Sequence, residues 1–469
     1  MKEFSRDEFS VFLDALLRTL LESRFGANGW DCLSAPANSV LLVDAIDAVL
    51  QDEHVWEDIY NRVRLTDGDS ASVRDKTYLD TVKALFRERV VSRFQLSMAR
   101  VEPLVWTTQF VEEWRKGNEI LAILTGNEIL SIAQTVHALE EGRIGILRPH
   151  ARVIGVPRSF WIPSDGTVCG GILVGHDGKS RLVRFEHPVR IDSALILNLP
   201  RKEEISLHRQ RTFEARAAQI VLLNPAGRVS ERADQKHLAH QCWQRAGIPT
   251  PAYWLVPKEW TSNQIHGLLL EIAEQVPAVY VLPDDSTEGD RVGRFSLQSG
   301  QVEDALFHIT QNIQPCNDAL IREECGNVHI YYDGVPRRAI LRMNVVKTGS
   351  GIWSYSGCWY VARDASSDVV SVGCGATILG FRDGRRALVC VEEGKSHFVP
   401  EEALDTESII SLGQVAVAAL EHDAPDTDRS SLVAFDMIPL WRPGEEIIRW
   451  MLLEANARPA GLAAAELIP

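Results

Sequence analysis

The sequence predicts an α/β protein whose main body follows an additional helical segment at the N-terminus. Between residues 116 and 229, short apolar stretches alternate with amphipathic helical patterns, as in sheets covered by helices. Between residues 323 and 469, long β-rich stretches surround one apolar helical pattern. The 469 residues suggest about three domains, because one domain has roughly 100–200 residues. We therefore expect several α/β domains after the helical segment.

Residues 1–115 are predicted to be helical. Ser5 and Glu8 have the spacing of a capping box, and Gly26 is the expected end of the first helix. Apolar residues recur at helical spacing between them: Phe9, Phe12, Leu13, Leu16, Leu17, Leu20 and Leu21. We interpret the segment as a helical bundle packed on the main body, with a dimerisation or partner-docking module as the alternative.

Residues 116–229 are predicted to form an α/β domain with a mainly parallel sheet. The expected strands are EILAILTG, RVIGVP, GGILVGH, RLVRFE, SALILNLP and AQIVLLN. The expected helices are SIAQTVHALEEGR and the charged stretch Glu203–Ala217.

Two further domains are expected, over residues 230–322 and 323–469. The first begins with one helix, SERADQKHLAHQCWQRAG, which Gly247 ends. It continues with the helix WTSNQIHGLLLEIAEQV, the strand AVYVLP and the polar loop DDSTEGDRVG. The second contains the strands AILRMNVVKTG, GIWSYSGCWYVAR and VSVGCGATIL, the helix SIISLGQVAVAALEH, and the strands SLVAFDMIPL and IIRWMLLEANARP.

Charge and cysteine content exclude several classes of function. The chain has 49 Lys and Arg against 64 Asp and Glu, a net charge of −15, which argues against general nucleic-acid binding and against docking on an anionic membrane. The eight cysteines form no CxxC pair, which indicates reduced thiols in a cytoplasmic protein. Charged residues near the N-terminus argue against a signal peptide, and we expect no apolar run that approaches the roughly 18 residues of a membrane span.

The last two expected strands carry the strongest chemical signal. Asp436 lies in LVAFDMIPL, and Glu454 and Asn456 lie in MLLEANARP. Strand alternation places Glu454 and Asn456 on the same face of their strand. Carboxylate and amide oxygens are the ligands that Mg²⁺ prefers. The pattern indicates a magnesium site, and the alternative is an edge strand with solvated polar side chains.

Two other features carry weaker signals. Lys236 lies on an amphipathic helix, where a lysine is ordinarily solvated. The loop DDSTEGDRVG contains Ser286 and Gly289, whose small side chains leave backbone N–H groups free to cradle phosphate. The loop has no P-loop motif, and a simple hairpin turn explains it equally well.

Taken in chain order, these features resemble an ATP-grasp ligase over about residues 116–465. The matching segments are the turn VLLNPAG, the helix DQKHLAH followed by GIPTP, the loop DDSTEGDRVG, the strands ALIREE and AILRMNVV, and the terminal segment LLEANARP. The nearest branches are glutathione-synthetase-like and D-alanine-ligase-like. The resemblance implies a pre-ATP-grasp α/β domain at 116–229, a lid at 230–322 and a catalytic subdomain with the metal site at 323–469.

The resemblance also implies roles for individual residues. One or two Mg²⁺ ions that bridge the phosphates of ATP would be held by Asp436, Glu454 and Asn456. Nucleotide contacts would come from Lys236, Ser286, Gly289, Arg291, Ile321, Glu323 and Glu324, with adenine stacked on Ile321 and Lys236 on the α- or β-phosphate. The γ-phosphate or an acyl phosphate would meet Arg342, and the substrate carboxylate would meet Arg363 or Arg458, with a surface cation as the alternative for both.

The sequence departs from the family pattern at one position. A second lysine is usual at the end of the lid strand, and Leu282 occupies that position here. Lys258 and Arg291 are near enough in sequence to substitute for it. The departure leaves open whether catalysis is retained.

The implied activity is ATP-dependent joining of a carboxylate to an amine through an acyl phosphate, with ADP and phosphate released. Small amino-acid-like or peptide substrates are expected. ATP and Mg²⁺ are the expected cofactors, and the expected assembly is a homodimer. A ligase that modifies a carrier protein or peptide through its N-terminal segment is one alternative. A non-catalytic nucleotide-binding protein of the same fold is another. No cysteine or serine nucleophile is expected, and Cys374 is interpreted as a packing residue.

Overall fold

The computed structural model describes residues 2–4, 63–65, 104–126, 130–145, 151–174, 180–199, 203–285, 291–347, 351, 353–371, 374–392 and 394–468. The chain divides into two compact units. The first comprises Met1–His137, Arg152–Ala194 and Ala218–Ile220, and the second comprises Ala138–Ala151, Leu195–Ala217 and Val221–Pro469. Both contain helices and sheets, so the predicted α/β class is confirmed. Most of the predicted N-terminal helical segment lies outside the described residues.

The described parts of residues 1–115 include strands that the helical periodicity did not predict. Two short strands, β1 (Lys2–Phe4) and β2 (Val63–Leu65), pair in parallel. A third, β3 (Leu104–Trp106), pairs with β8 of the first unit and is followed by α6 (Thr108–Arg115). The α/β sheet of the first unit therefore begins before residue 116.

The sheet of the first unit has the strand order β4-β5-β7-β8-β3, with β6 beside β7. Its elements are β4 (Glu119–Leu124), α7 (Leu130–Glu140), β5 (Ala151–Val156), β6 (Trp161–Ile162), β7 (Thr167–Val174) and β8 (Ser180–Arg190). The pairs β5–β7 and β7–β8 are antiparallel, and β3–β8 is parallel. The prediction of a mainly parallel sheet is wrong for these strands, because the connection from β7 to β8 is too short for a crossover helix.

The border between the two units crosses β9 (Ser193–Ile196). The helices and strand that follow in the second unit are α8 (Glu204–Ala217), β10 (Val221–Leu222), α9 (Arg228–Asp234) and α10 (Lys236–Arg245). The sequence predicted one helix over residues 230–247, but the helix is interrupted at Gln235, whose φ and ψ are −104° and 107°. Next to this break the backbone N–H of Lys236 donates to the carbonyl of Asp284. Gly247 ends α10 in the left-handed conformation, as predicted.

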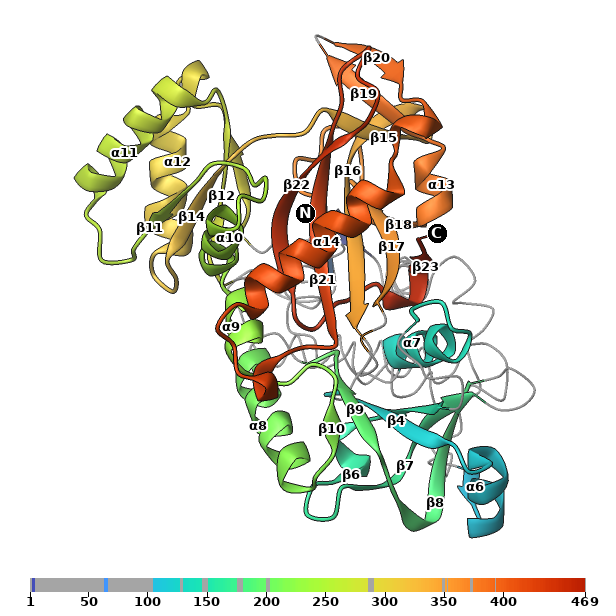
Figure 1. The fold of residues 1–469 in the computed structure, drawn as a ribbon. Helices are drawn as coiled ribbons and strands as arrows, with labels where there is room; N and C mark the ends of the chain where they lie inside the picture. Colours follow the sequence, from blue (N-terminus) through green and yellow to red (C-terminus); the bar gives the residue numbers. More distant parts are fainter. Residues whose placement is uncertain are drawn as a thin grey trace. The chain divides into compact units, whose positions relative to one another are not determined.

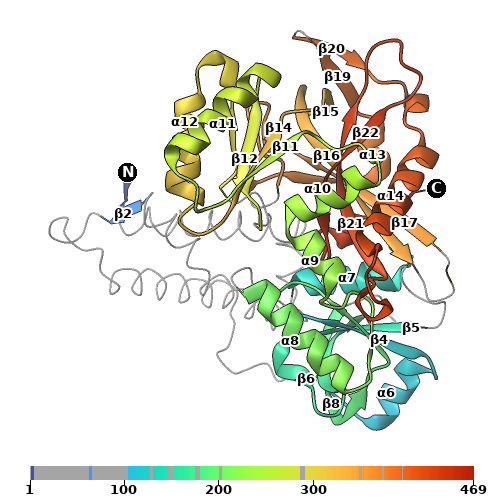
Figure 2. The same ribbon diagram turned by 60° about the vertical axis from the view of Figure 1, so that its left-hand side comes forward.

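A small lobe of the second unit, residues 253–323, has an antiparallel sheet of order β11-β14-β12-β13. Its elements are β11 (Tyr253–Val256), α11 (Ser262–Gln275), β12 (Val279–Pro283), β13 (Gly293–Phe295), α12 (Val302–His308) and β14 (Ala319–Glu323). Both helices lie on one side of the sheet (Figure 2). They bury Val281, Ile321 and other apolar side chains of that side in a common core.

The other side of this sheet is here called the inner face. According to the strand register and alternation, the side chains on the inner face are those of Tyr253, Leu255, Tyr280, Leu282, Leu320 and Arg322. Leu282 and Leu320 are opposite each other and buried, although neither belongs to the core beneath the helices.

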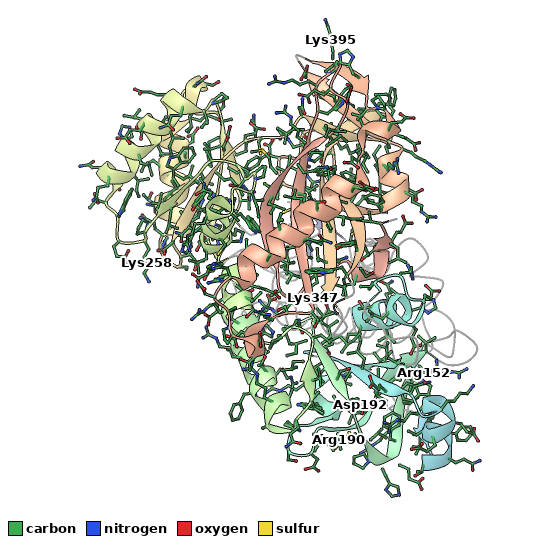
Figure 3. All side chains as sticks on the ribbon, viewed as in Figure 1. Arg152, Arg190, Asp192, Lys258, Lys347 and Lys395 are labelled. Carbon is green, nitrogen blue, oxygen red and sulfur yellow. The ribbon has the colours of Figure 1, made fainter. Side chains whose placement is uncertain are left out.

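The large lobe of the second unit carries the sheet β18-β17-β16-β15-β19-β20, with β21 paired to β16 and β22 paired to β21. Its elements are β15 (Val328–Tyr332), β16 (Val335–Lys347), β17 (Trp353–Val361), β18 (Thr377–Gly380), α13 (Phe381–Arg385), β19 (Leu388–Glu392), β20 (Lys395–Phe398), α14 (Thr406–Glu421), β21 (Leu432–Leu440), β22 (Arg449–Asn456) and β23 (Glu466–Leu467). Figure 1 shows α14 across one face of β16, β21 and β22. Lys347, at the end of β16, pairs with Glu421 of α14 at 3.7 Å (Figure 3).

The helices α9 and α10 belong to the large lobe. Val229, Ala239 and Trp243 share a core cluster with Phe435 of β21 and with residues of α14. The predicted domain boundary at residue 230 therefore does not coincide with the start of the small lobe.

Among the described residues, Glu401–Glu421 is long and apolar enough to cross a membrane. This corrects the expectation that no such stretch exists. Most of the segment is α14, whose Ile409, Ala416 and Leu420 are buried in the core of the large lobe. Core helices of this kind pass the same test of length and composition.

Candidate functional site

A row of charged side chains crosses three neighbouring strands of the large lobe. Arg342 of β16 is opposite Asp436 of β21, which is opposite Glu454 of β22. The residues next to them on each strand, Met343, Phe435 and Ala455, are buried in the core beneath α14. Alternation therefore places Arg342, Asp436 and Glu454 on the face away from α14.

Arg342 holds Asp436 in a bidentate ion pair. Its Nε and Nη2 atoms each donate to a different oxygen of Asp436 at 2.7 Å. The guanidinium also lies 4.6 Å from the ring centroid of Tyr360, and Nη1 donates to the Tyr360 hydroxyl at 3.1 Å. Burial by itself would raise the pKa of Asp436, but the charge and hydrogen bonds of Arg342 outweigh it and lower that pKa. Asp436 is therefore an anion although it is 1% exposed.

Glu454 has the opposite electrostatic balance. Burial raises the pKa of Glu454, Lys236 opposes the rise, and the adjacent Asp436 carboxylate adds to it. The pKa of Asp436 is lowered and that of Glu454 is raised, so Glu454 is the member of the pair that keeps a proton more readily. The register of β21 and β22 shifts directly after this pair, where Met437 is opposite Leu452 and Leu453 is the additional residue.

Two basic side chains approach Glu454 from outside the sheet. Lys236, at the start of α10, is 5% exposed, and its Nζ lies 3.9 Å from Glu454 Oε2. Arg322, on the inner face of the small lobe, donates from Nη1 to the carbonyl of Leu453 at 3.3 Å. Its charge acts on both Asp436 and Glu454. With Arg342, these cations outnumber the two carboxyl groups, so this region favours an anionic ligand within a chain of net charge −15.

Contacts with Asp284 hold the first turn of α10, and therefore Lys236, in position. Asp284, at the end of β12, accepts from the backbone N–H of His237 at 2.8 Å and contacts His237 Nδ1 at 2.5 Å. The Asp284 carbonyl accepts from Lys236 Nζ at 3.4 Å. The first turn of α10 is thus attached to the end of the small-lobe strand β12.

Asp436, Glu454 and Asn456 offer only oxygen ligands to a metal ion. Asn456 lies two residues after Glu454 on the same face, and its buried Nδ2 has no hydrogen-bond partner among the described residues. A divalent cation between the two carboxyl groups would offset the repulsion between their charges. Hard oxygen ligands of this kind fit Mg²⁺. In the described part of the chain, no group of three His, Cys, Asp or Glu side chains offers another metal site.

The structure corrects the expected role of Ile321. Its side chain is fully buried in the core beneath α11 and α12, so it does not line a nucleotide pocket. Glu323 accepts from the backbone N–H of Ala252 at 3.1 Å. Glu324 accepts two hydrogen bonds from Arg294, at 2.9 and 2.7 Å, and a further one from Arg338. These contacts outweigh burial and lower the pKa of Glu324.

The structure pairs Arg363 and Arg458 with carboxylates that do not belong to the charged row. The Arg363 side chain is 68% exposed and pairs with Asp364. Arg458 is 4% exposed and binds Glu204 at 2.7 Å and Asp234 at 2.6 Å. Both carboxylates already neutralise Arg458, so the expectation that it binds a substrate carboxylate is wrong. It instead holds the segment after β22 against α8 and α9.

The remaining expected contacts lie in or beside the small-lobe loop. Ser286 and Gly289 fall outside the described residues. Arg291 donates from Nη1 to the carbonyl of Asn312 at 3.2 Å. Lys258, the other suggested substitute for a lysine at 282, is exposed at the turn between β11 and α11 (Figure 3).

Sequence reasoning missed Arg322 and Asp284. Alternation in ALIRE could have placed Arg322 on the face opposite Ile321, but it does not show which face meets the large lobe. The contact between Asp284 and α10 joins residues 47 positions apart, and no local pattern signals it.

Comparisons with known proteins give matches to solved structures. D-alanyl-alanine synthetase A from Vibrio cholerae is 12% identical with a TM-score of 0.43, over 73% of this chain and 90% of that one. D-cycloserine synthetase DcsG is 15% identical with a TM-score of 0.43, over 74% and 95%. VanG D-Ala:D-Ser ligase from Enterococcus faecalis is 13% identical with a TM-score of 0.42, over 73% and 91%. All three are named as ligases or synthetases.

No protein-family model and no curated protein matches the sequence. Because the identities and TM-scores of the structural matches are low, the function proposed below rests on the geometry of the site.

Proposed function

We propose that the protein is an ATP-dependent carboxylate–amine ligase that forms an amide bond through an acyl phosphate. The observation that carries the proposal is the paired carboxyl groups of Asp436 and Glu454, surrounded by Lys236, Arg322 and Arg342. A Mg²⁺–polyphosphate suits such a site, because the two carboxyl groups and the Asn456 amide would hold the metal while Lys236 and Arg322 would receive the phosphates.

The proposed reaction needs positioning and charge neutralisation more than a protein nucleophile. A substrate carboxylate attacks the γ-phosphate of ATP, which gives an acyl phosphate and ADP. An amine then attacks the acyl carbon, and phosphate leaves. Bound Mg²⁺ supplies neutralisation of the phosphate charge. Lys236 contributes a cation from α10, and Arg342 keeps Asp436 ionised and adds positive charge beside it.

The cysteine next to the charged row of Arg342, Asp436 and Glu454 does not support thiol chemistry. Cys358 is opposite Arg342 on β17, and burial raises its pKa to about 12, so its thiol stays protonated. We propose small amino-acid-like or peptide substrates, with ligation to a carrier protein or peptide as the alternative. A cytoplasmic location and a homodimer are part of the same proposal.

Leu282 favours a second candidate, a nucleotide-binding protein without turnover. Its apolar side chain is buried on the inner face, where a phosphate-binding lysine would be expected from the resemblance. In that case ATP and Mg²⁺ would raise the melting temperature, but no substrate would release ADP.

A screen of ADP release with pairs of amino acids and dipeptides, followed by mass analysis of the product, tests the proposal. We expect a pair-dependent release of ADP and a product lighter by one water than the summed substrates. Asp436→Asn is the matched negative variant. ATP binding without ADP release across the panel would favour the second candidate, and absence of ATP binding would contradict both.

A further inference from the structure

The inner face of the small lobe presents Arg322 toward the carboxyl pair. Arg322 lies on β14, opposite Tyr253 of β11 and Tyr280 of β12, and is half-buried. Its Nη1 atom reaches the carbonyl of Leu453, the additional residue of β22 directly before Glu454. The small lobe therefore meets the large lobe through this side chain beside the candidate metal ligands.

Within the part of the chain that the structure describes, most of the hydrogen-bonding capacity of Arg322 is unused. A guanidinium has five N–H donors. Among the described residues, the contact with Leu453 is the one hydrogen bond that the Arg322 side chain makes. The pKa of the nearby buried His240 is lowered to about 3, mainly by burial and next by the charge of Arg322. His240 is therefore neutral and does not compete with Arg322 for an anion.

Leu282 is a diagonal neighbour of Arg322. Leu282 is opposite Leu320, and Arg322 follows two residues later on the same strand and face. Diagonal neighbours on antiparallel strands lie roughly 7–8 Å apart, which long side chains can span. A cation at position 322 can therefore reach the region that a cation at position 282 would occupy.

We propose that Arg322 binds the phosphate chain of the nucleotide from the small lobe, and so supplies the contact that Leu282 cannot make. The inference rests on the proposed function, because it requires a polyphosphate at the carboxyl pair. Lys236 and Arg322 then hold the phosphates from the side of Glu454, while Arg342 stays paired with Asp436.

The test measures the affinities for ATP–Mg²⁺ and for adenosine by calorimetry on the full chain. Arg322→Met is expected to weaken ATP binding about 10- to 100-fold, because a charge-assisted hydrogen bond is lost. Adenosine, which has no phosphate, should bind within about twofold of the wild type. Arg245→Met, at an exposed arginine of α10, removes the same charge elsewhere and should leave both affinities unchanged.

A rescue variant separates phosphate binding from a structural role. Leu282→Lys in the Arg322→Met background should recover at least about half of the lost binding free energy for ATP, because it returns a cation to the inner face. If Arg322 only fastens β14 to Leu453, Arg322→Met will weaken ATP and adenosine equally and the lysine will not rescue, which overturns the inference. If Arg322→Met does not fold, Arg322→Gln replaces it with the same expectations.

The two proposals fail in different ways. Wild-type protein that binds neither ATP nor ADP with Mg²⁺ overturns the proposed function. If the wild type and Arg322→Met bind ATP with equal affinity, the role of Arg322 is overturned and the proposed function is not.

Discussion

Arg342 and Asp436 face each other across β16 and β21, and two hydrogen bonds of 2.7 Å join the guanidinium to the buried carboxylate. The pair lies in the sheet itself, so two backbone strands hold its geometry. Glu454 continues the row on β22, and its protonation depends on the charge that Arg342 stabilises on Asp436. The ion pair thereby fixes the electrostatics of the candidate metal site.

Removal of Arg342 should destabilise the fold strongly. Arg342→Met leaves the Asp436 carboxylate buried without its partner, which costs about 3–5 kcal/mol. The double variant Arg342→Met/Asp436→Leu should be markedly more stable than the single variant, because no uncompensated charge remains. Urea denaturation at pH 7 measures both. Equal stabilities of the single and double variants would show that the charge of Asp436 is compensated elsewhere.

Glu454→Gln should preserve the fold and impair metal-dependent nucleotide binding. Glutamine has nearly the size of glutamate, and its amide N–H group can donate to the Asp436 carboxylate. It cannot provide an anionic ligand, so the rise in melting temperature with ATP should lose its dependence on Mg²⁺. Glu446→Gln, at an exposed residue before β22, is the control and should behave as the wild type. A Mg²⁺-dependent shift that survives in Glu454→Gln would exclude Glu454 as a ligand.

Arg458→Met should reduce stability much more than Arg449→Met. Arg458 is buried against Glu204 and Asp234, and its loss leaves both acidic side chains without their cation, at a cost of about 3–5 kcal/mol. Arg449 also lies on β22 but forms an exposed pair with Glu445, for which about 0–1 kcal/mol is expected. Denaturation midpoints compare the two variants. A loss below about 1 kcal/mol for Arg458→Met would argue against its scaffolding role.

His208 should make the fold sensitive to acid. It accepts from Arg458 at Nδ1 and donates from Nε2 to the carbonyl of Asn224. Burial, and then the charge of Arg458, lowers the pKa of His208 to about 3, from about 6.5 in the unfolded chain. The unfolded state therefore binds more protons between these values, and stability falls by up to about 1.4 kcal/mol per pH unit as the pH decreases below about 6.5.

His208→Gln should reduce this dependence on pH. Glutamine offers one acceptor and one donor, as neutral histidine does, but it does not titrate. The variant should be close to the wild type at pH 7.5 and should lose less stability at pH 5, as denaturation at both values will show. An unchanged difference between the two pH values would place the sensitivity elsewhere, for example at His240.

The sequence by itself determined several parts of this protein. Long β-rich stretches located β16, β17, β21 and β22, and strand alternation placed Glu454 and Asn456 on one face. The sequence also indicated Lys236, which lies beside Glu454. The location of a strand follows from local composition and its faces follow from alternation, and a sequence displays both directly.

Tertiary structure alone decided which faces meet. Alternation separates Ile321 from Arg322, but only packing buries Ile321 beneath α11 and α12 and turns Arg322 toward Leu453. The partners of Arg458 lie more than 200 positions away, and the interruption at Gln235 adjoins contacts with Asp284. The parallel pairing of β3 with β8 likewise joins segments that are far apart in the sequence. Such contacts arise from long-range burial of apolar faces, and local patterns state which residues share a face without stating what that face covers.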